Sequence, residues 1–313
     1  MMRLAVLSFL LMAATAAVAQ QTAQYTQNNF NMFALNPAVA GSKDCMDVRL
    51  GYRQQWVGFS GAPVTGWASI AGTIKPRGRA YRAHRHGIGA FVESDQAGPL
   101  GYTSFQLAYA YHLQMNRDVF LSMGLFAGFR QEKFSLGDVN ATENTDPALL
   151  NNGNSLVVPD VTPGIWLYGK NAWAGLSIEQ FLGNRVENIG TETRLNRTFL
   201  LSLGQRFALT KDFSVVPSAF FRYAAEVPLV MDLNVMMEYK RRLGIGATYR
   251  NQDAVAFMVK LPFLKYFTLG YSYDITTSSL RAGGANTHEI ILGIYPCTPL
   301  DPDKAIVRCP IFE

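Results

Sequence analysis

The residues that most often perform catalysis or bind metals are sparse in this chain, and their spacing suits neither task. The four histidines are His84, His86, His112 and His288. No two of them have the spacing of the HExxH zinc motif. His84 and His86 stand among several arginines, where solvated turn residues are the simplest interpretation. The histidines therefore predict no metal site, and the sequence predicts no cofactor.

Motifs for nucleophilic catalysis and phosphate binding are missing as well. The chain has no GxSxG nucleophile elbow. Gly244 and Gly246 lie inside a strand pattern, where glycine more often relieves crowding than cradles a phosphate. Asp232 and Glu238 also fall at alternate strand positions, which fits a polar interior. We therefore predict that the protein is not an enzyme.

The clearest pattern is a β-hairpin between residues 231 and 249. Apolar side chains alternate with small or polar ones along both of its arms, and a basic turn at 240–242 joins the arms. The same pattern recurs along most of the chain. Such a sheet needs an apolar medium on one side and a polar interior on the other, and an outer-membrane β-barrel supplies both.

The alternation predicts about fourteen strands, an even number typical of bacterial single-chain barrels with both termini in the periplasm. Strands of nine or more residues suit a tilted membrane crossing. A soluble β-sandwich is the alternative, because the sequence alone does not show which medium the apolar faces meet. The predicted strands are 46–56, 64–74, 86–93, 102–113, 121–130, 158–168, 172–180, 197–207, 213–223, 231–239, 243–249, 254–260, 267–274 and 287–295.

The connections between these strands alternate in length, which predicts their orientation. Short turns of such barrels face the periplasm and long loops face outside. The connection 75–85 is an exception, since it is long but falls on the short-turn side. The short connections are 114–118, 169–171, 210–212, 240–242 and 261–265, and the long ones are 135–156, 181–196 and 275–285.

The N-terminus has the features of a secretory signal peptide. Arg3 precedes an apolar run and small residues that end at Ala19, where we expect cleavage. No later apolar run reaches 18 residues, which excludes a helical inner-membrane protein. The net charge of +5 is spread over turns, so nucleic acid is not an expected partner. The predicted organisation is a signal peptide (1–19), a periplasmic N-terminal segment (20–45), an outer-membrane barrel (46–295) and a periplasmic C-terminal tail (296–313).

Three cysteines follow the signal peptide: Cys45, Cys297 and Cys309. In an oxidising compartment Cys297 and Cys309 could close a short loop in the tail, and we slightly favour this pair. A bridge from Cys45 to either tail cysteine is the alternative, because a barrel places its first and last strands side by side.

Two segments contain more turn-forming residues (Gly, Pro and Asn) than the wall of a barrel requires. In the first, Asn36, Pro37 and Gly41 interrupt any strand pattern ahead of residue 46. This segment could fold back as a plug or clasp near the base of the barrel.

The second segment spans residues 52–63 and forms an aromatic tip on a rigid turn. Trp56 and Phe59 stand among Gly58, Gly61 and Pro63. Such a tip suits either an anchor at the membrane surface or a site that binds a partner.

Together these segments resemble the signature of the PorP/SprF family of outer-membrane proteins of the type IX secretion system. The resemblance spans nearly the whole mature chain, and its combination of motifs is specific although each fragment alone is weak. The matching positions are Asn36, Pro37, Ala38, Ala40, Gly41, Tyr52, Arg53, Gln55, Trp56, Gly58, Phe59, Gly61, Ala62, Pro63, Gly98, Pro99, the run 108–113, Tyr249, Arg250, the run 270–274, His288 and Glu289.

The resemblance implies a non-enzymatic barrel that works with the secretion apparatus of Bacteroidota. Some members are thought to contact periplasmic ring components. Others are paired with a large secreted surface adhesin, as in gliding motility, and we favour this role, with docking of the adhesin's C-terminal signal domain. A diffusion porin or a channel for hydrophobic substrates is the alternative function.

Overall fold

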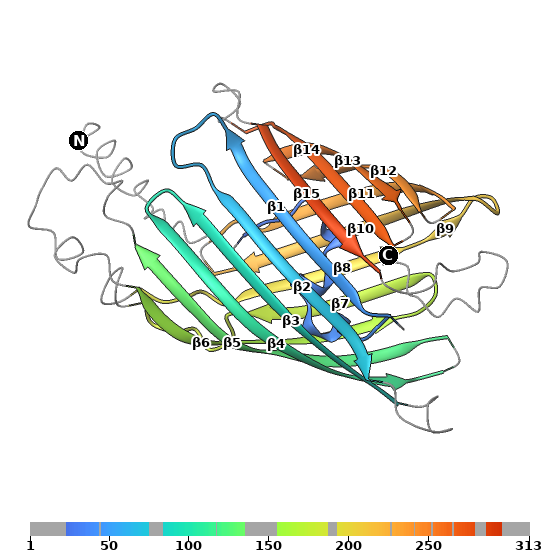
Figure 1. Ribbon diagram of the computed structural model, residues 1–313, viewed down its shortest axis with the longest axis horizontal. Coiled ribbons are helices and arrows are strands. Elements are labelled where there is room, and N and C mark those ends of the chain that lie inside the picture. Colours follow the sequence, from blue (N-terminus) through green and yellow to red (C-terminus); the bar gives the residue numbers. More distant parts are fainter. Residues whose placement is uncertain are drawn as a thin grey trace, which may run out of the picture.

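The protein is a closed antiparallel β-barrel (Figure 1). A computed structural model describes residues 23–295 except 44, 75–83, 117, 135–154, 187–192, 226, 241, 252, 265 and 279–285. Because β8 and β9 both pair with β10, they act as one strand interrupted at Arg206, and the wall has 14 strands. The strands are β1 (Asp47–Val57), β2 (Val64–Ile74), β3 (His84–Ala97), β4 (Leu100–Gln114), β5 (Phe120–Phe134), β6 (Leu156–Tyr168), β7 (Ala172–Glu179), β8 (Thr198–Gln205), β9 (Phe207–Ala208), β10 (Phe213–Ala224), β11 (Val230–Tyr239), β12 (Leu243–Arg250), β13 (Ala254–Phe263), β14 (Phe267–Thr276) and β15 (Asn286–Ile294).

Each strand of the wall pairs with the next along the chain, and the last strand pairs with the first. β15 lies antiparallel to β1, with Val48 opposite Ile294 and Arg53 opposite Glu289. This seam closes the sheet, so it excludes the open sheets of a sandwich and confirms the predicted barrel. Closure also removes the free edges on which other strands could add.

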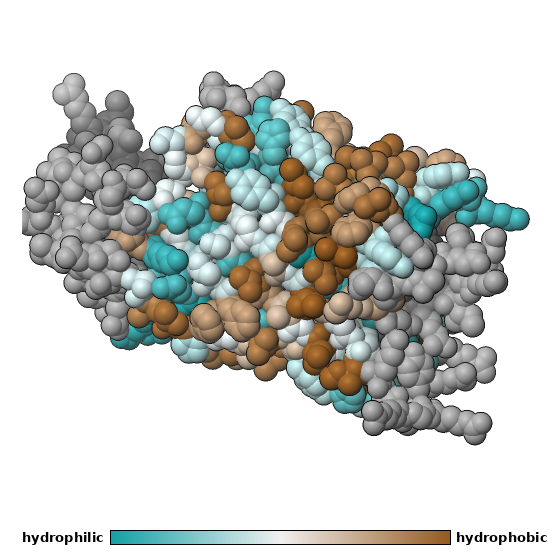
Figure 2. All heavy atoms as spheres, viewed as in Figure 1, coloured by the Kyte–Doolittle hydropathy of each residue, from teal (hydrophilic) through white to brown (hydrophobic). Residues whose placement is uncertain are grey.

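The two faces of the wall follow the alternation in the sequence. On β11, Leu233, Val235 and Met237 are exposed on the outside, whereas Asp232 and Asn234 are buried inside. Figure 2 shows hydrophobic residues over much of the outer surface, densely so over β14 and β15. Exposed large apolar side chains also occur on the strands all around the wall, so the apolar face surrounds the barrel, as a lipid environment requires.

The wall is taller on one side. β3, β4 and β5 have 14, 15 and 15 residues, whereas β7 has 8. The sequence prediction ended β3 at Glu93, too early, because polar residues at 94–96 resemble a turn. The structure instead continues the strand to Ala97 and turns at Gly98 and Pro99. Ser94 and Gln96 are exposed on the outer face, and the buried Asp95 accepts the Thr65 hydroxyl on the inner face.

The two longest connections, 135–155 and 180–197, lie at the same end of the barrel. We call the ends the long-loop mouth and the short-turn mouth. The short-turn mouth carries 75–83, 115–119, 169–171, 209–212, 240–242 and 264–266, and the long-loop mouth carries 135–155, 180–197 and 277–285 together with the tighter turns 58–63, 98–99, 225–229 and 251–253.

The disulfide prediction needs a correction. Cys45, just ahead of β1, is disulfide-bonded. In a chain with three cysteines, a bridge at Cys45 requires Cys297 or Cys309 and is incompatible with the favoured pairing of those two with each other. Both tail cysteines, like the signal peptide, lie outside the described residues.

The helices of the described chain are short. They are η1 (Asn28–Phe30), α2 (Met32–Leu35) and η2 (Pro37–Val39). Among the described residues, no helix has the length and apolar character needed to cross a membrane.

Candidate functional site

Residues 23–43, which we call the lumen segment, occupy the bore of the barrel. The three short helices belong to this segment and are the blue turns inside the barrel in Figure 1. All of its residues are buried except Gln24, Asn29 and Ala34, which are half-buried. Lys43 is its only charged residue. The lumen segment therefore meets the wall through amide, hydroxyl and backbone groups and also through apolar side chains, as where Phe33 packs against Phe126.

The lumen segment runs from one mouth of the barrel to the other. The amide of Ala23 donates to the Tyr102 hydroxyl at 3.4 Å, and Arg222 donates to the Ala23 carbonyl at 3.0 Å, both near the long-loop mouth. At the opposite end, Thr73 donates to the carbonyls of Gly41 and Lys43 at 2.8 and 2.7 Å. The sequence predicted a periplasmic segment that could fold back as a plug or clasp near the base of the barrel. The structure places residues 23–43 in the bore, enclosed by the wall.

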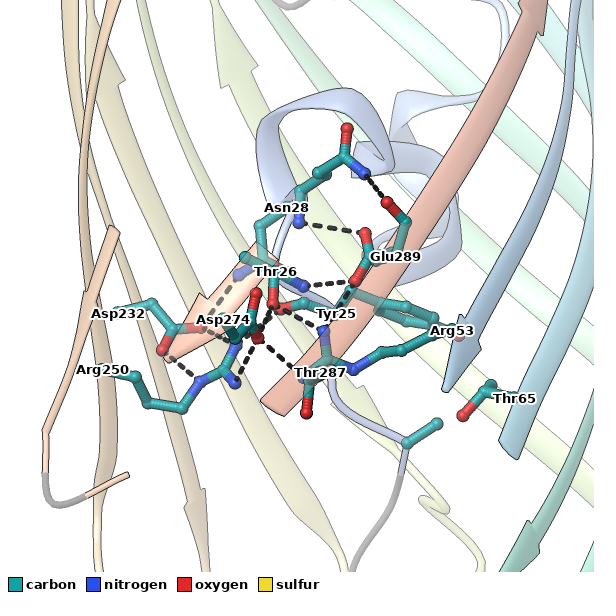
Figure 3. Close-up of polar contacts among 12 residues, drawn as sticks. Tyr25, Thr26, Asn28, Arg53, Thr65, Asp232, Arg250, Asp274, Thr287 and Glu289 are labelled. Atoms are coloured by element: carbon teal, nitrogen blue, oxygen red, sulfur yellow. Dashed lines mark hydrogen bonds and ion pairs between the residues drawn. The ribbon is translucent and has the colours of Figure 1, made fainter. Parts of the chain in front are cut away.

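A buried ionic network holds the start of the lumen segment (Figure 3). Arg53 of β1 forms ion pairs of 3.1 Å with Asp274 and with Glu289, and each of these side chains is at most 1% exposed. Thr26 donates its backbone amide to Glu289 at 2.7 Å and its hydroxyl to Asp274 at 2.5 Å. The Gln27 amide donates to the second Glu289 oxygen at 3.1 Å. The same carboxylates thus bind both the wall and the lumen segment.

A second arginine reaches the lumen segment from the other side (Figure 3). Arg250 of β12 pairs with Asp232 at 2.8 Å and donates to the Tyr25 carbonyl at 2.9 Å. Asn28 donates its side-chain amide to Asp232 at 2.9 Å. Removing one partner of a buried ion pair costs about 3–5 kcal/mol, because the remaining charge is left without compensation. The network therefore fixes the segment in one position.

The middle of the lumen segment is held by Asn36. Its side-chain amide donates to the carbonyls of Ile165 and Leu176 at 3.0 and 3.2 Å, which are partners on β6 and β7. Its side-chain oxygen accepts the Ala38 amide at 2.9 Å and caps η2. Ser177 donates its hydroxyl to the Leu35 carbonyl at 2.6 Å. One asparagine therefore joins two wall strands to the segment.

Glycines in the wall make room for the backbone of the lumen segment. A Cβ on Gly164 would lie 2.2 Å from the Asn36 side-chain oxygen, and one on Gly124 would lie 2.4 Å from the Ala38 nitrogen. A Cβ on Gly87 would lie 1.9 Å from the Ala40 carbonyl oxygen. These distances are well inside van der Waals contact, so only glycine fits where the segment touches these strands.

His112 anchors the end of the lumen segment near the short-turn mouth. Its Nε2 lies 2.7 Å from the Ala40 carbonyl oxygen, and its Nδ1 lies 3.0 Å from the Tyr168 hydroxyl. A carbonyl only accepts, so Nε2 carries the hydrogen and Nδ1 accepts from Tyr168. His112 is fully buried. His84 and His86, predicted to lie in a solvated turn, lie instead on β3 and contact Tyr111 and Tyr109 at 2.8 Å, although His84 is exposed and His86 half-buried.

Two small cavities lie beside the lumen segment. One cavity of about 30 Å³ lies between Tyr25, Met32 and Phe220, and another of about 20 Å³ lies between Phe30 and Met258. Each has room for one or two water molecules. No group of three or more potential metal ligands occurs among the described residues.

A family model supplies the identity of this barrel. The model of the type IX secretion system membrane protein PorP/SprF matches residues 17–294. The chain belongs to the PorP/SprF family. No curated protein sequence matches the chain significantly.

Solved structures of other outer-membrane barrels resemble the fold of this PorP/SprF protein. The toluene transporter TbuX of Ralstonia pickettii is 9% identical, with a TM-score of 0.51 over 85% of this chain and 92% of that chain. The toluene transporter TodX of Pseudomonas putida is 11% identical, with a TM-score of 0.48 over 88% and 94%. A FadL homologue of Pseudomonas aeruginosa is 9% identical, with a TM-score of 0.49 over 86% and 92%. At these identities the likeness to TbuX shows the fold alone, which is that of an outer-membrane barrel.

The structure brings together several PorP/SprF motif residues that are far apart in the sequence. Arg53, Arg250, Asp274 and Glu289 form the buried network, and Asn36 lies further along the same lumen segment. Pro37 opens η2, and Gly41 takes a positive φ of 72° next to Gly87. These motif residues therefore position the lumen segment.

The remaining motif residues shape the long-loop mouth or face outward. Gly61 and Gly98 have positive φ and join adjacent hairpin tips, with the Gly98 amide donating to the Gly61 carbonyl at 2.8 Å. Gln55 bonds through its amide to the Pro63 carbonyl. Tyr52 is 50% exposed on the outer wall, Phe59 is 40% exposed at the tip, and Trp56 and Gly58 have positive φ beside it.

Sequence reasoning missed the partners of the lumen segment on the wall. They include His112, Ser177, Gly124 and Gly164. Asn28, within the segment itself, was missed as well. The glycines at inward positions of β3, β5 and β6 were a signal in the sequence that another part of the chain packs closely against these strands.

Proposed function

We propose that this PorP/SprF protein is a docking barrel of the type IX secretion system. In this role it binds the C-terminal signal domain of a secreted surface adhesin, or a periplasmic ring component, without passing solute through its bore. The observation that supports this role is the lumen segment. It occupies the bore and forms hydrogen bonds to both halves of the wall. A filled bore leaves the mouths and the rim as the surfaces for binding.

The long-loop mouth offers a rigid apolar tip for such binding. Val57 and Phe59 are exposed there, on a turn tied to the next hairpin through Gly61 and Gly98. A preformed aromatic tip loses little conformational entropy on binding. The short-turn mouth carries Leu264, which is 79% exposed.

Capture of partners from native detergent extracts tests the proposal and separates the two mouths. We expect the full-length barrel to retain either an adhesin or a ring component. Phe59→Ser should weaken capture at the long-loop mouth at least tenfold, and Leu264→Ser serves as the matched control at the other mouth. Recovery of neither class of partner by the wild-type barrel would contradict the docking role.

A channel is the alternative function, and only the outer-membrane fold that the chain shares with the toluene transporter TbuX favours it. Single-channel recording in planar bilayers distinguishes the two. The docking role predicts almost no current from the intact barrel. A steady open current through wild-type protein would instead support a channel.

A further inference from the structure

Two arginines face each other on the connection between β7 and β8 at the long-loop mouth. Arg185 and Arg194 form an antiparallel bridge, so their side chains lie side by side on one face. Backbone hydrogen bonds on both sides of the bridge fix this register, from Val186 to Thr193 at 2.8 Å and from Leu195 to Asn184 at 2.9 Å. We call the two arms, residues 181–186 and 193–197, the basic hairpin.

The other face of the basic hairpin is buried against β6. Val186 and Leu195 form an apolar cluster with Val158, which lies at an inward position of that strand. The Asn184 side chain donates to the Pro159 carbonyl at 2.6 Å, so the hairpin runs beside β6 and continues the wall above β7 and β8. Its arginines lie on the face turned away from the apolar cluster.

The arginines of the basic hairpin have no anionic partner among the described residues. Arg185, Arg194 and Arg197 are all exposed, and none of them forms an ion pair there. The whole connection 180–197 also contains two glutamates, but three arginines leave it with a net positive charge. Because like charges placed directly opposite each other repel, an anion bound between Arg185 and Arg194 would stabilise this face.

Apolar side chains adjoin these arginines. Phe181 and Leu182 are exposed on the hairpin, and Phe199 is exposed at the start of β8, on the lipid-facing side of the wall. The Arg197 guanidinium lies 5.8 Å from the centroid of the Phe181 ring, and its Nε donates to the Phe181 carbonyl at 2.7 Å. Aromatic rings beside basic groups at the end of an apolar surface are typical of the level at which lipid headgroups lie.

We propose that the basic hairpin binds the phosphate groups of a phosphorylated lipid in the leaflet at the long-loop mouth. The planar guanidinium groups of Arg185 and Arg194 suit phosphate oxygens, which accept paired N–H donors. Phe181 and Leu182 contact the acyl chains of the same lipid. Long loops of bacterial barrels face outside, so the ligand is a lipid of the outer leaflet, the phosphorylated lipid A of lipopolysaccharide. A nucleic acid or an acidic protein would leave the adjoining apolar side chains uncovered.

Titration of the full-length barrel in detergent with diphosphoryl lipid A tests this assignment. Replacing all three arginines (Arg185→Gln, Arg194→Gln and Arg197→Gln) should raise the Kd by about tenfold or more, because the charge-assisted hydrogen bonds are lost. The matched control removes three exposed lysines at the short-turn mouth (Lys170→Gln, Lys211→Gln and Lys240→Gln). It should change the Kd by less than about twofold, because these charges lie beyond the screening length.

Two further ligands identify what the hairpin recognises. Dephosphorylated lipid A should bind the wild-type barrel as weakly as diphosphoryl lipid A binds the triple arginine variant. Inorganic phosphate should not displace diphosphoryl lipid A, because it lacks the acyl chains that contact Phe181 and Leu182. Equal binding of both forms of lipid A, displacement by inorganic phosphate, or an unchanged Kd in the triple arginine variant would overturn the proposal.

Stability separates a binding role of these arginines from a structural one. Arg194→Gln removes one of two opposed like charges, so in lipid-free detergent the variant should unfold at no lower a urea concentration than the wild type. Its affinity for diphosphoryl lipid A should nevertheless fall. A loss of affinity that comes with a loss of stability would mean that Arg194 supports the fold of the hairpin, and would overturn its assignment to the lipid.

Discussion

Arg53 and Glu289 are partners across the seam of the barrel, and their side chains form a 3.1 Å ion pair inside it. Arg53 belongs to the first strand and Glu289 to the last, so this pair links the two ends of the sheet. The same Glu289 carboxylate accepts the backbone amides of Thr26 and Gln27. One buried carboxylate therefore takes part both in closing the wall and in seating the lumen segment.

Replacing Arg53 should destabilise the barrel and loosen its lumen segment together. Arg53→Met leaves Asp274 and Glu289 buried without their shared cation, at a cost of about 3–5 kcal/mol in the free energy of unfolding. Urea unfolding of the refolded barrel measures this loss. Limited proteolysis should cut within residues 23–43 of the variant and leave that region of the wild type intact.

An exposed ion pair supplies the control for Arg53. Lys170 and Asp118 lie 2.9 Å apart, and their side chains are 61% and 60% exposed. Because solvent screens such pairs, Lys170→Met should change the free energy of unfolding by less than about 1 kcal/mol. Equal effects of Arg53→Met and Lys170→Met would refute the role assigned to the network.

Adding one methyl group to the wall should displace the lumen segment. The Cβ of Gly124→Ala would fall 2.4 Å from the Ala38 backbone nitrogen, which has no flexible side chain to move aside. We expect the variant to show ionic current in planar bilayers where the wild type shows almost none. Gly66→Ala is the matched control, because nothing lies within 4 Å of its Cβ. Unchanged conductance and unchanged protease protection of the Gly124→Ala segment would contradict the tight fit.

The wall was predictable from the sequence, whereas the contents of the bore were only partly so. Asp232 and Leu233 alternate in character because they face different media, and this periodicity is local enough to read directly. β2 has the bounds that its pattern predicts. The contact of His112 with Ala40 spans 72 positions and depends on how a non-repetitive segment folds. No periodicity specifies such a contact, so His112 looked like any other polar residue.

The medium around the wall can be tested on its outer face. Val235 is 54% exposed in the middle of β11, where the barrel assignment places lipid. Val235→Arg should lower the free energy of unfolding in bilayers by about 2–4 kcal/mol. Leu264→Arg, beyond the end of β13, should cost about 0–1 kcal/mol because its surroundings are interfacial. Similar costs at the two positions would mean that lipid does not surround the middle of the wall.

Asn36 allows a test of hydrogen-bond direction within the lumen. Its side-chain NH₂ faces two carbonyl oxygens, those of Ile165 and Leu176. Asn36→Asp keeps the shape but turns an oxygen toward these carbonyls, so repulsion and a buried charge are added to the lost bonds. Asn36→Ala removes the bonds alone and should cost about 1–3 kcal/mol.

The aspartate variant should therefore unfold at lower urea concentration than the alanine variant, although it is closer to wild type in size. Equilibrium unfolding of both variants in the same detergent measures the difference. If the order were reversed, the amide would not be donating to the wall, and Asn36 would act through the Ala38 cap alone.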